Sequence, residues 1–378
     1  MLDLKSEHNL FADDVRAAVE TVLSSQQFIN GPYVSDLEEE LCKRVGARAA
    51  VAVNSGTDAL LCALMALEIG PGDEVIVPTF TFFATAGAVH RVGAKPVFVD
   101  IDAKTFNIAP DKIEAAVTDK TRAIIAVHLF GQCADMDAIA EIAKRHNLKV
   151  IEDAAQALGA TYRGRGACTL SDLACVSFYP TKNLGGYGEG GMIFAQDESL
   201  ATIVRQLRNH GESERYVHER VGGNFRLDTM KAGILLAKLP YWEDFAMRRQ
   251  ANAERYDELL AGAPLITPFV ADGARHVYHQ YSLLCPNRDE LKSFLGDRGV
   301  QSGIYYPIPL HLQKCFSYLG HKPGDLPVAE EVCKRIVSLP CHPMLARDDV
   351  AYVAESIHEF YAATDAERPA IVGVGTTG

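Results

Sequence analysis

Short apolar segments of strand length recur along the first half of the chain, and stretches long enough for a helix separate them. Strands that alternate with helices predict a mainly parallel sheet with right-handed crossover connections. Helices cover both faces of such a sheet, so its strands are apolar almost throughout, as these segments are. The predicted fold class is therefore α/β. The segments are Ala49–Val53, Glu74–Val77, Lys95–Val99, Arg122–Val127 and Lys149–Glu152.

The length of 378 residues exceeds one typical domain. We expect N-terminal helices and a large domain in residues 1–245. A connecting helix at Met247–Leu260 then leads into a smaller α/β domain, residues 246–366, and residues 367–378 form a frayed tail. Further predicted helices are Phe11–Leu23, Val34–Val45, Asp197–Gly211, Thr229–Leu239, Asp289–Arg298 and Asp348–Tyr361, with a strand at Tyr278–Leu284 and a loop at Glu212–Gly223.

A glycine-rich segment, Ser177–Gly191, lies between two further apolar runs and contains a single lysine, Lys182. Pro180 and the glycines argue against regular structure there. A lysine on a loop between two core strands can be held in place and desolvated, which favours its neutral, nucleophilic form. The alternative is a solvated lysine on a flexible surface turn, and an isolated loop of this composition would favour that alternative.

Two nucleotide-binding motifs are excluded for this segment. The glycines Gly186, Gly188 and Gly191 have the spacing of a dinucleotide fingerprint, but they precede a strand instead of opening a helix after one. A phosphate-binding Walker loop has its lysine after the glycines, whereas Lys182 precedes them. The segment therefore needs another explanation.

Two upstream features supply that explanation. The strand Lys149–Glu152 leads directly to Asp153, at the carboxyl end where open α/β sheets bind ligands. The strand Ala49–Val53 turns through Ser55-Gly56-Thr57 into a helix, whose N-terminus can bind an anion. A phosphate site, a buried carboxylate and a positioned Lys182 together suit pyridoxal phosphate.

Sequence strings along most of the chain point to one family. The strings are Phe28–Pro32, Ser55–Leu60, Pro78–Phe82, Val97–Asp102, Glu152–Gln156, Ser177–Lys182, Asn224–Asp228, Tyr306–His311 and Leu339–Pro343. With them the chain resembles the fold-type-I pyridoxal-phosphate enzymes and, more narrowly, the DegT/DnrJ/EryC1/StrS family of nucleotide-sugar aminotransferases. Each string alone is modest support, and their common order makes the resemblance specific.

The resemblance implies roles around the cofactor ring. Lys182 would bind the cofactor covalently and, when freed, would move a proton at the substrate carbon. Asp153 would keep the pyridine nitrogen protonated, although a strand-end aspartate can also simply cap a helix. Gln156 would lie beside the ring. A subgroup of the family has histidine in place of the lysine and dehydrates its substrate, so Lys182 favours amino transfer.

The resemblance also implies a phosphate site and a second subunit. Gly56, Thr57 and Ser177 would bind the phosphate. Phe82 would stack on the ring, although core packing is the default for an isolated phenylalanine. Asn224 matches an asparagine that reaches the phosphate from the other subunit, which implies a homodimer with shared active sites.

The expected substrate side is less specific. Arg226 could meet an acidic substrate group, or it could pair with Asp228 at the start of a helix. Tyr305, Tyr306 and His311 match a substrate-side loop of the small domain, although two tyrosines beside prolines can also simply pack. The histidines show no metal-ligand spacing, so no metal is predicted.

The predicted reaction moves an amino group from L-glutamate to a UDP- or dTDP-linked keto-sugar, in amino-sugar or surface-polysaccharide biosynthesis. The strings Gly131–Asp135 and Tyr306–His311 favour amination at C3, with a uronic acid as one option. Alternatives are a dehydratase or a keto-cyclitol aminotransferase of the same fold. A third alternative is a catalytically silent regulatory protein, against which the intact set of Lys182, Asp153 and Ser177 argues.

Charge and cysteine content restrict the partners and the compartment. The net charge of −12 disfavours nucleic acid and anionic membranes as partners. The chain lacks an 18-residue apolar stretch, and Met1–Glu7 lacks the apolar core of a secretory signal. The nine cysteines show no C-x-x-C spacing and are expected to be reduced. We therefore expect a cytoplasmic protein.

Overall fold

A seven-stranded sheet forms the centre of the molecule, in a computed structural model that describes residues 1–364. The strand order is β1-β9-β8-β5-β4-β2-β3. Neighbouring strands are parallel except for β9, which runs antiparallel to both β1 and β8. The predicted α/β class is therefore confirmed. The strands are β1 (Ala49–Val53), β2 (Glu74–Pro78), β3 (Lys95–Val99), β4 (Thr121–Val127), β5 (Lys149–Asp153), β8 (Leu173–Ser177) and β9 (Gly191–Ala195).

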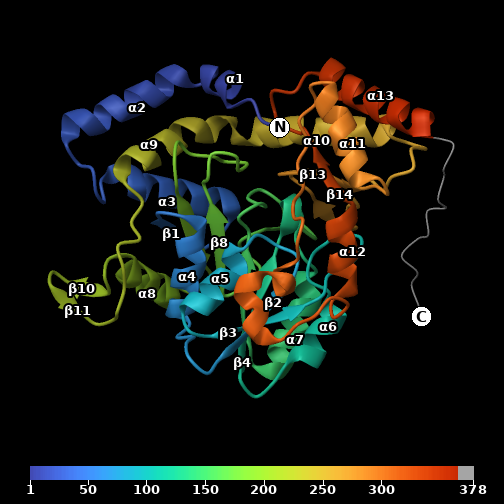
Figure 1. Cartoon of the computed structure of the whole chain (residues 1–378). Helices are drawn as coiled ribbons and strands as arrows, with labels where there is room; N and C mark the ends of the chain where they lie inside the picture. The colour runs from blue at the N-terminus through green and yellow to red at the C-terminus, as the bar shows by residue number, and fades with distance from the viewer. Residues whose placement is uncertain (365–378) are drawn as a thin grey trace.

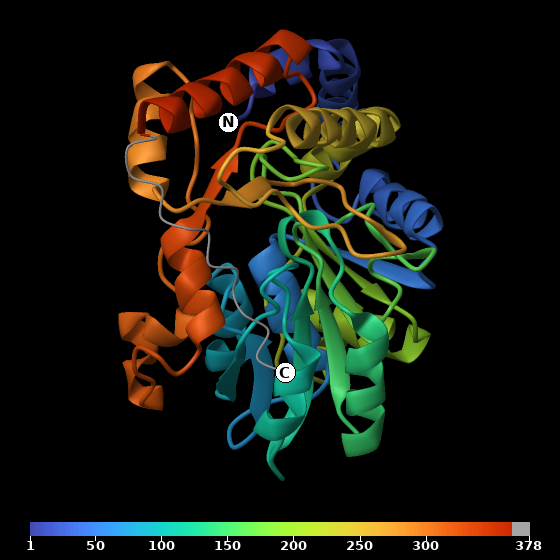
Figure 2. The ribbon, with the colours of Figure 1, turned by 90° about the vertical axis from the view of Figure 1, so that its right-hand side faces the viewer.

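Helices cover both faces of this sheet (Figure 2). Successive residues of β4 alternate between the two hydrophobic cores: Ile124 belongs to one core and Ile125 to the other. This two-sided burial explains why the strands are apolar throughout. One face packs against α3 (Pro32–Val45), α7 (Met136–His146) and α9 (Thr229–Lys238), and the other against α4 (Gly56–Ala66), α5 (Ala84–Arg91) and α8 (Glu198–Arg208).

The C-terminal part has a core of its own. Its strands β13 (Tyr281–Leu284) and β14 (Ile336–Leu339) pair antiparallel. They pack with the second half of α10 (Trp242–Leu259), which crosses between the two parts (Figure 1). The other helices of this part are α11 (Arg288–Asp297), α12 (Pro327–Arg335) and α13 (Arg347–Thr364).

The predicted domain division at residue 245 falls inside α10 and stays a prediction. The predicted end of the small domain at residue 366 and the predicted tail, residues 367–378, lie outside the described residues. No helix among residues 1–364 is both long and apolar enough to cross a membrane.

Two local predictions differ from the structure. The predicted loop Glu212–Gly223 contains a short antiparallel hairpin, β10 (Glu212–Glu214) with β11 (Val217–His218), which projects from the body beside α8 (Figure 1). The strand predicted to start at Tyr278 starts only at Tyr281. The backbone before it instead hydrogen-bonds to the loop after β4, which becomes important at the candidate site.

Two helices precede α3 at the N-terminus. The predicted helix Phe11–Leu23 is confirmed as α2 (Ala12–Ser25), which lies against α9 (Figure 1). A six-residue helix, α1 (Leu4–Asn9), precedes it and was not predicted, because six residues are too few to show a helical repeat.

Candidate active site

A cavity of about 560 Å³ opens at the carboxyl edge of the central sheet. This volume lies within the range of roughly 300–1,000 Å³ that is usual for small-molecule sites. The edge is where α/β sheets bind ligands, because the loops after several parallel strands meet there. The predicted site residues that line this cavity are Gly56, Thr57, Phe82, Asp153, Gln156, Ser177, Lys182, Tyr305 and Tyr306.

Lys182 extends from the connection between β8 and β9. The connection turns tightly: the Lys182 N–H donates to the carbonyl of Tyr179 at 2.8 Å, and the Gly186 N–H donates to that of Phe178 at 2.7 Å. A Cβ on Gly185 would lie 2.2 Å from the Pro180 oxygen, so this position requires glycine. Burial lowers the pKa of Lys182 to about 8, although the nearby charge of Asp153 opposes the shift. About a tenth of the amine is therefore neutral at pH 7, far more than for an ordinary lysine.

Asp153 ends β5 with its carboxylate facing the cavity, and only 6% of the residue is exposed. The Thr85 hydroxyl donates to Asp153 Oδ2 at 2.7 Å, and the Ala155 N–H donates to Oδ1 at 3.3 Å. Burial raises the pKa of Asp153, while these hydrogen bonds and the charge of Lys182 oppose the rise. The chain continues from Asp153 into turns and not into a helix, so the helix-cap alternative is wrong.

The N-terminus of α4 also lines the cavity. Ser55 caps this helix by accepting a hydrogen bond from the Asp58 N–H at 3.0 Å. The N–H groups of Gly56 and Thr57 lie in the first turn, where a helix has no internal acceptors for them. A Cβ on Gly56 would lie 2.7 Å from Cβ of Ser177, so glycine is what allows Ser177 to approach the helix end.

Gln156 and Tyr306 form a defined donor–acceptor pair across the cavity. The Phe130 N–H donates to Oε1 of Gln156 at 2.7 Å, which fixes the orientation of the amide. Nε2 of Gln156 therefore donates to the Tyr306 hydroxyl at 3.1 Å. Because this hydroxyl accepts from Gln156, its own hydrogen remains free to donate to a ligand.

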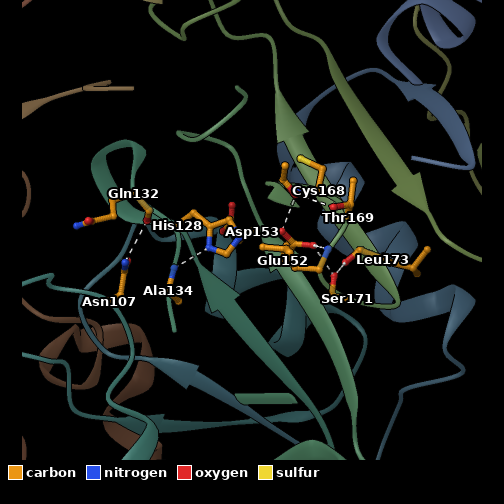
Figure 3. Close-up of polar contacts among 12 residues, drawn as sticks. Asn107, His128, Gln132, Ala134, Glu152, Asp153, Cys168, Thr169, Ser171 and Leu173 are labelled. Carbon is orange, nitrogen blue, oxygen red and sulfur yellow. Dashed lines mark hydrogen bonds and ion pairs between the residues drawn. The ribbon is translucent and has the colours of Figure 1, made fainter. Parts of the chain in front are cut away.

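A fully buried ion network supports the strand ends beneath this site (Figure 3). The Glu152 carboxylate accepts hydrogen bonds from the N–H groups of Cys168 and Leu170, each at 2.8 Å. His128 Nε2 lies 2.8 Å from the same carboxylate. His128 Nδ1 accepts from the Ala134 N–H at 3.2 Å, so the hydrogen of a neutral imidazole is on Nε2 and points to Glu152. These bonds hold the ends of β4 and β5, and so Asp153, in place.

The structure also places three predicted site residues outside the cavity. His311 is buried, with Nδ1 2.7 Å from the Thr79 hydroxyl and Nε2 3.2 Å from the Glu330 carboxylate. The predicted contact of His311 with substrate does not fit this position, because both ring nitrogens are already engaged. Loop 303–312 does line the cavity, but through its two tyrosines.

Asn224 and Arg226 lie on the segment before α9. Asn224 is exposed and forms a backbone bridge with Asn209. Arg226 donates to the side chain of Asn209 at 2.5 Å, and its buried Nε has no partner in the described chain. Asp228 pairs with Lys231, at 3.0 Å, so the predicted alternative of an Arg226–Asp228 pair is wrong.

The sequence reasoning missed several cavity residues and a partner of one of them. Thr85 donates to Asp153 but does not line the cavity itself, and it lies on α5 without any motif to mark it. His279 and Gln280 come from the segment before β13, far away in sequence, and Glu189 lies on the Lys182 loop. Of these residues, only Glu189 could have been found from the sequence, because it lies within the glycine-rich segment Ser177–Gly191. The described residues contain no group of three or more potential metal ligands.

The residues present fit pyridoxal phosphate. The helix end with its free N–H groups suits a phosphate, and a half-exposed Phe82 offers a ring face inside the cavity. Asp153 is a buried carboxylate whose pKa is raised by burial, and a protonated pyridine nitrogen would supply it with a cationic partner. Lys182 is an amine with a lowered pKa on the same cavity.

Comparisons with known proteins agree with this fit. The profile of the DegT/DnrJ/EryC1/StrS aminotransferase family matches residues 10–358. A "pleiotropic regulatory protein" of Geobacillus stearothermophilus is 49% identical, over 96% of this chain and 98% of its own. UDP-2-acetamido-2-deoxy-3-oxo-D-glucuronate aminotransferase of Pseudomonas aeruginosa is 45% identical, over 94% of this chain and 98% of its own.

Solved structures of similar sequence share this fold. DesV of S. venezuelae, in complex with a ketimine intermediate, superposes with a TM-score of 0.93 at 41% identity, over 97% of this chain and 98% of that one. The lysine-bearing cavity, the fold and the matched profile lead to one assignment. The chain is a pyridoxal-phosphate-dependent sugar aminotransferase and belongs to the DegT/DnrJ/EryC1/StrS aminotransferase family.

Proposed function

We propose that the chain transfers an amino group from L-glutamate to C3 of a UDP- or dTDP-linked 3-keto-sugar, in amino-sugar or polysaccharide biosynthesis. The observation that supports amino transfer is the meeting of Lys182, Asp153 and the α4 N-terminus around one cavity. The position of the keto group is supported by the name of the Pseudomonas aeruginosa relative, a 3-oxo-glucuronate aminotransferase. The same name supports a uronic acid as the sugar.

When bound, pyridoxal phosphate would supply an electron sink for the substrate carbon. Gly56, Thr57 and Ser177 would hold the phosphate group, and Asp153 would keep the ring nitrogen protonated by a charge-assisted hydrogen bond. Lys182 would bind the cofactor, and its free amine would be the base that moves the proton at the reacting carbon. Its lowered pKa of about 8 suits this task, because a group that accepts and returns a proton works best with a pKa near the working pH.

Two alternatives have less support. A dehydratase of this fold would have histidine where this chain has Lys182. The name of the Geobacillus stearothermophilus relative, a regulatory protein, supports a catalytically silent regulator as the second alternative. However, a silent regulator has no need for a buried carboxylate and a lysine of lowered pKa on one cavity, since both cost stability in the folded chain. The proposed compartment is the cytoplasm, which the nine free cysteines support.

The test offers ¹⁵N-glutamate with UDP- and dTDP-linked 3-keto- and 4-keto-sugars, each as the neutral sugar and as the uronic acid. We expect ¹⁵N at C3 of at least one 3-keto-sugar and 2-oxoglutarate in equal amount. A keto-cyclitol and a dehydratase substrate are also supplied, because the alternative functions would use them. The proposal would be overturned by nitrogen transfer only to the cyclitol, by loss of water without nitrogen transfer, or by no turnover of any of these substrates.

We also propose that the active unit is a homodimer in which Asn224 completes the phosphate site of the partner subunit. Asn224 is exposed and lies outside the cavity of its own chain, which supports a role elsewhere. The neighbouring hairpin β10–β11 and the residues after it expose Tyr216 to 78% and Val221 to 90%. Exposed apolar side chains on a projecting hairpin are typical of a surface that another chain covers.

A complementation experiment tests the shared site. Lys182→Ala and Asn224→Ala subunits are mixed under conditions of subunit exchange. If Asn224 serves the partner, a mixed dimer has one site with both lesions and one with neither, so activity returns, up to about half of the wild-type sites per mixed dimer. The control is each variant alone, and Asn224→Ala must itself be impaired. Confirmed exchange without returning activity would mean that Asn224 serves its own subunit.

A further inference from the structure

The two oxygens of the Asp153 carboxylate accept hydrogen bonds of unequal length. The Thr85 hydroxyl lies 2.7 Å from Oδ2, and the Ala155 N–H donates to Oδ1 at 3.3 Å. The longer distance exceeds the usual N–H···O range of roughly 2.7–3.2 Å, whereas the shorter one is typical of a hydroxyl that donates to a carboxylate. Thr85 therefore provides the stronger of the two bonds that fix the plane of this carboxylate.

Thr85 reaches Asp153 from another part of the sheet edge. It lies in the first turn of α5, which follows β2, and β4 lies between β2 and β5, the strand that Asp153 ends. Thr85 is completely buried and does not line the cavity. Any effect of its hydroxyl on a bound molecule therefore passes through its hydrogen-bond partners.

A second threonine sets the direction of the Thr85 hydroxyl. The hydroxyl oxygens of Thr81 and Thr85 are 3.2 Å apart, and either of them can donate. An ionised carboxylate only accepts hydrogen bonds, so Thr85 uses its single hydrogen on Asp153 and must accept from Thr81. The result is one ordered chain, from Thr81 through Thr85 to Asp153. Each bond of such a chain polarises the next, and both threonines are buried, where hydrogen bonds are stronger than in water.

The Thr85 hydroxyl opposes the effect of burial on Asp153. Burial raises the pKa of Asp153, and the hydrogen bond from Thr85 is the largest of the contributions that lower it. The other titratable groups that interact electrostatically with Asp153 are Lys182, His128, Tyr306 and Cys175. Burial keeps the last two uncharged at neutral pH. Without Thr85 the carboxylate would therefore ionise less readily.

We propose that Thr85 is a positioning residue for Asp153: its hydroxyl, directed by Thr81, fixes the orientation of the carboxylate and favours its ionised form. An ionised and correctly oriented Asp153 would keep the ring nitrogen of the cofactor protonated. This consequence for catalysis rests on the proposed amino transfer. The effect on Asp153 itself does not, because both hydrogen bonds lie within the chain and need no cofactor.

The effect on Asp153 is tested by unfolding the cofactor-free, full-length protein across pH. The gain in the free energy of unfolding that Asp153→Asn produces is measured in two backgrounds, wild type and Thr85→Val. The folded pKa of Asp153 is raised, so this gain grows with pH until the carboxyl is fully ionised in the folded state, and then levels off. We expect the gain to level off at a higher pH in the Thr85→Val background.

Only the pH dependence of the gain is compared, because a change in packing or in the contact with the new amide shifts the gain equally at every pH. Levelling at the same pH in both backgrounds would overturn the proposal, since Thr85 would then not act on the ionisation of Asp153. If Thr85→Val does not fold, Thr85→Ala takes its place, because alanine also lacks the hydroxyl and adds no bulk.

The consequence for catalysis is tested by the kinetics of the loaded Thr85 variants. We expect Thr85→Val to lower kcat about 10-fold, the effect of losing one hydrogen bond to a charged group. KM should change little, because Thr85 does not line the cavity. Thr85→Ser keeps the hydroxyl and should restore most of kcat. A serine variant as slow as the valine variant would contradict the proposal, because the methyl group and not the hydroxyl would then matter.

Thr121→Val is the matched control. Thr121 is also buried, and its hydroxyl accepts from the Thr118 N–H at 2.9 Å, but it starts β4 and does not line the cavity. This variant should keep the wild-type kcat. If it lowers kcat as much as Thr85→Val does, loss of any buried hydroxyl suffices and the proposal fails. If the wild type aminates no sugar at all, the proposed function fails, while the unfolding experiment still decides whether Thr85 acts on Asp153.

Discussion

Replacing Lys182 with alanine is expected to give a folded protein that binds pyridoxal phosphate and transfers no amino group. The fold should survive because Lys182 lines a cavity, and its lowered pKa means that the charged amine does not stabilise the folded, cofactor-free chain. The phosphate site on α4 and Asp153 remain, so the cofactor still has its anchors. Removal of the general base alone costs about 10²–10⁴-fold, and loss of the covalent anchor adds to it.

The measurement combines glutamate-dependent turnover with chemical mapping. Borohydride reduction of the loaded wild-type protein should fix the cofactor on the peptide that contains Lys182. The matched control is Lys149→Ala, because Lys149 starts β5, pairs with Asp172 at 2.9 Å and lies away from the cavity. That variant should keep wild-type turnover. A cofactor adduct on another lysine, or on none, would contradict the assignment of Lys182.

Replacing Asp153 with asparagine should lower kcat by about 10²–10³-fold, the usual cost of removing one preorganised electrostatic partner. A neutral amide cannot keep the ring nitrogen protonated, although it preserves the shape of the site and the contact with Thr85. A variant with near wild-type turnover would show that Asp153 only supports the strand end.

The same substitution should stabilise the cofactor-free protein. The folded pKa of Asp153 is raised by burial, so the folded state binds this proton more tightly than the unfolded state does. Wild-type stability therefore falls as pH rises from the ordinary carboxyl range through the raised pKa, and ionised Asp153 destabilises the fold above it. The free energy of unfolding of Asp153→Asn should exceed that of the wild type at neutral pH and not below about pH 3. Adding the cofactor should reverse the order at neutral pH, because only the wild type gains a full ion pair.

The sequence was sufficient for the central sheet and for the part of the site that follows its strands. Strands buried on both faces need no subtle periodicity to be seen, so Lys95–Val99 was predicted with the bounds that β3 has. Asp153 ends β5, Gly56 starts α4 shortly after β1, and Lys182 lies on the loop after β8. The parallel arrangement of these strands brings their ends to one edge of the sheet.

The rest of the site depends on packing between distant segments, which no local pattern reveals. His311 was predicted as a substrate residue because it matches a substrate-side loop of the family, yet its ring is fixed between Thr79 and Glu330. His279 was not predicted as a site residue, because its segment reaches the cavity through backbone hydrogen bonds to Gly131 and Phe130, which are distant in sequence. Because of those bonds the predicted strand also starts three residues late, at Tyr281.

The reversed direction of β9 has a kinetic consequence for the lysine. Because β9 returns antiparallel beside β8, Ser177 and Gly191 pair directly, and both ends of the Lys182 loop are fixed at the rim of the cavity. The freed amine cannot swing away with its loop. Its effective molarity at the reacting carbon can therefore reach roughly 10⁵ M, far above that of any amine in solution. Recapture of the cofactor by the lysine is then an intramolecular step whose rate does not depend on the concentration of free amines around the enzyme.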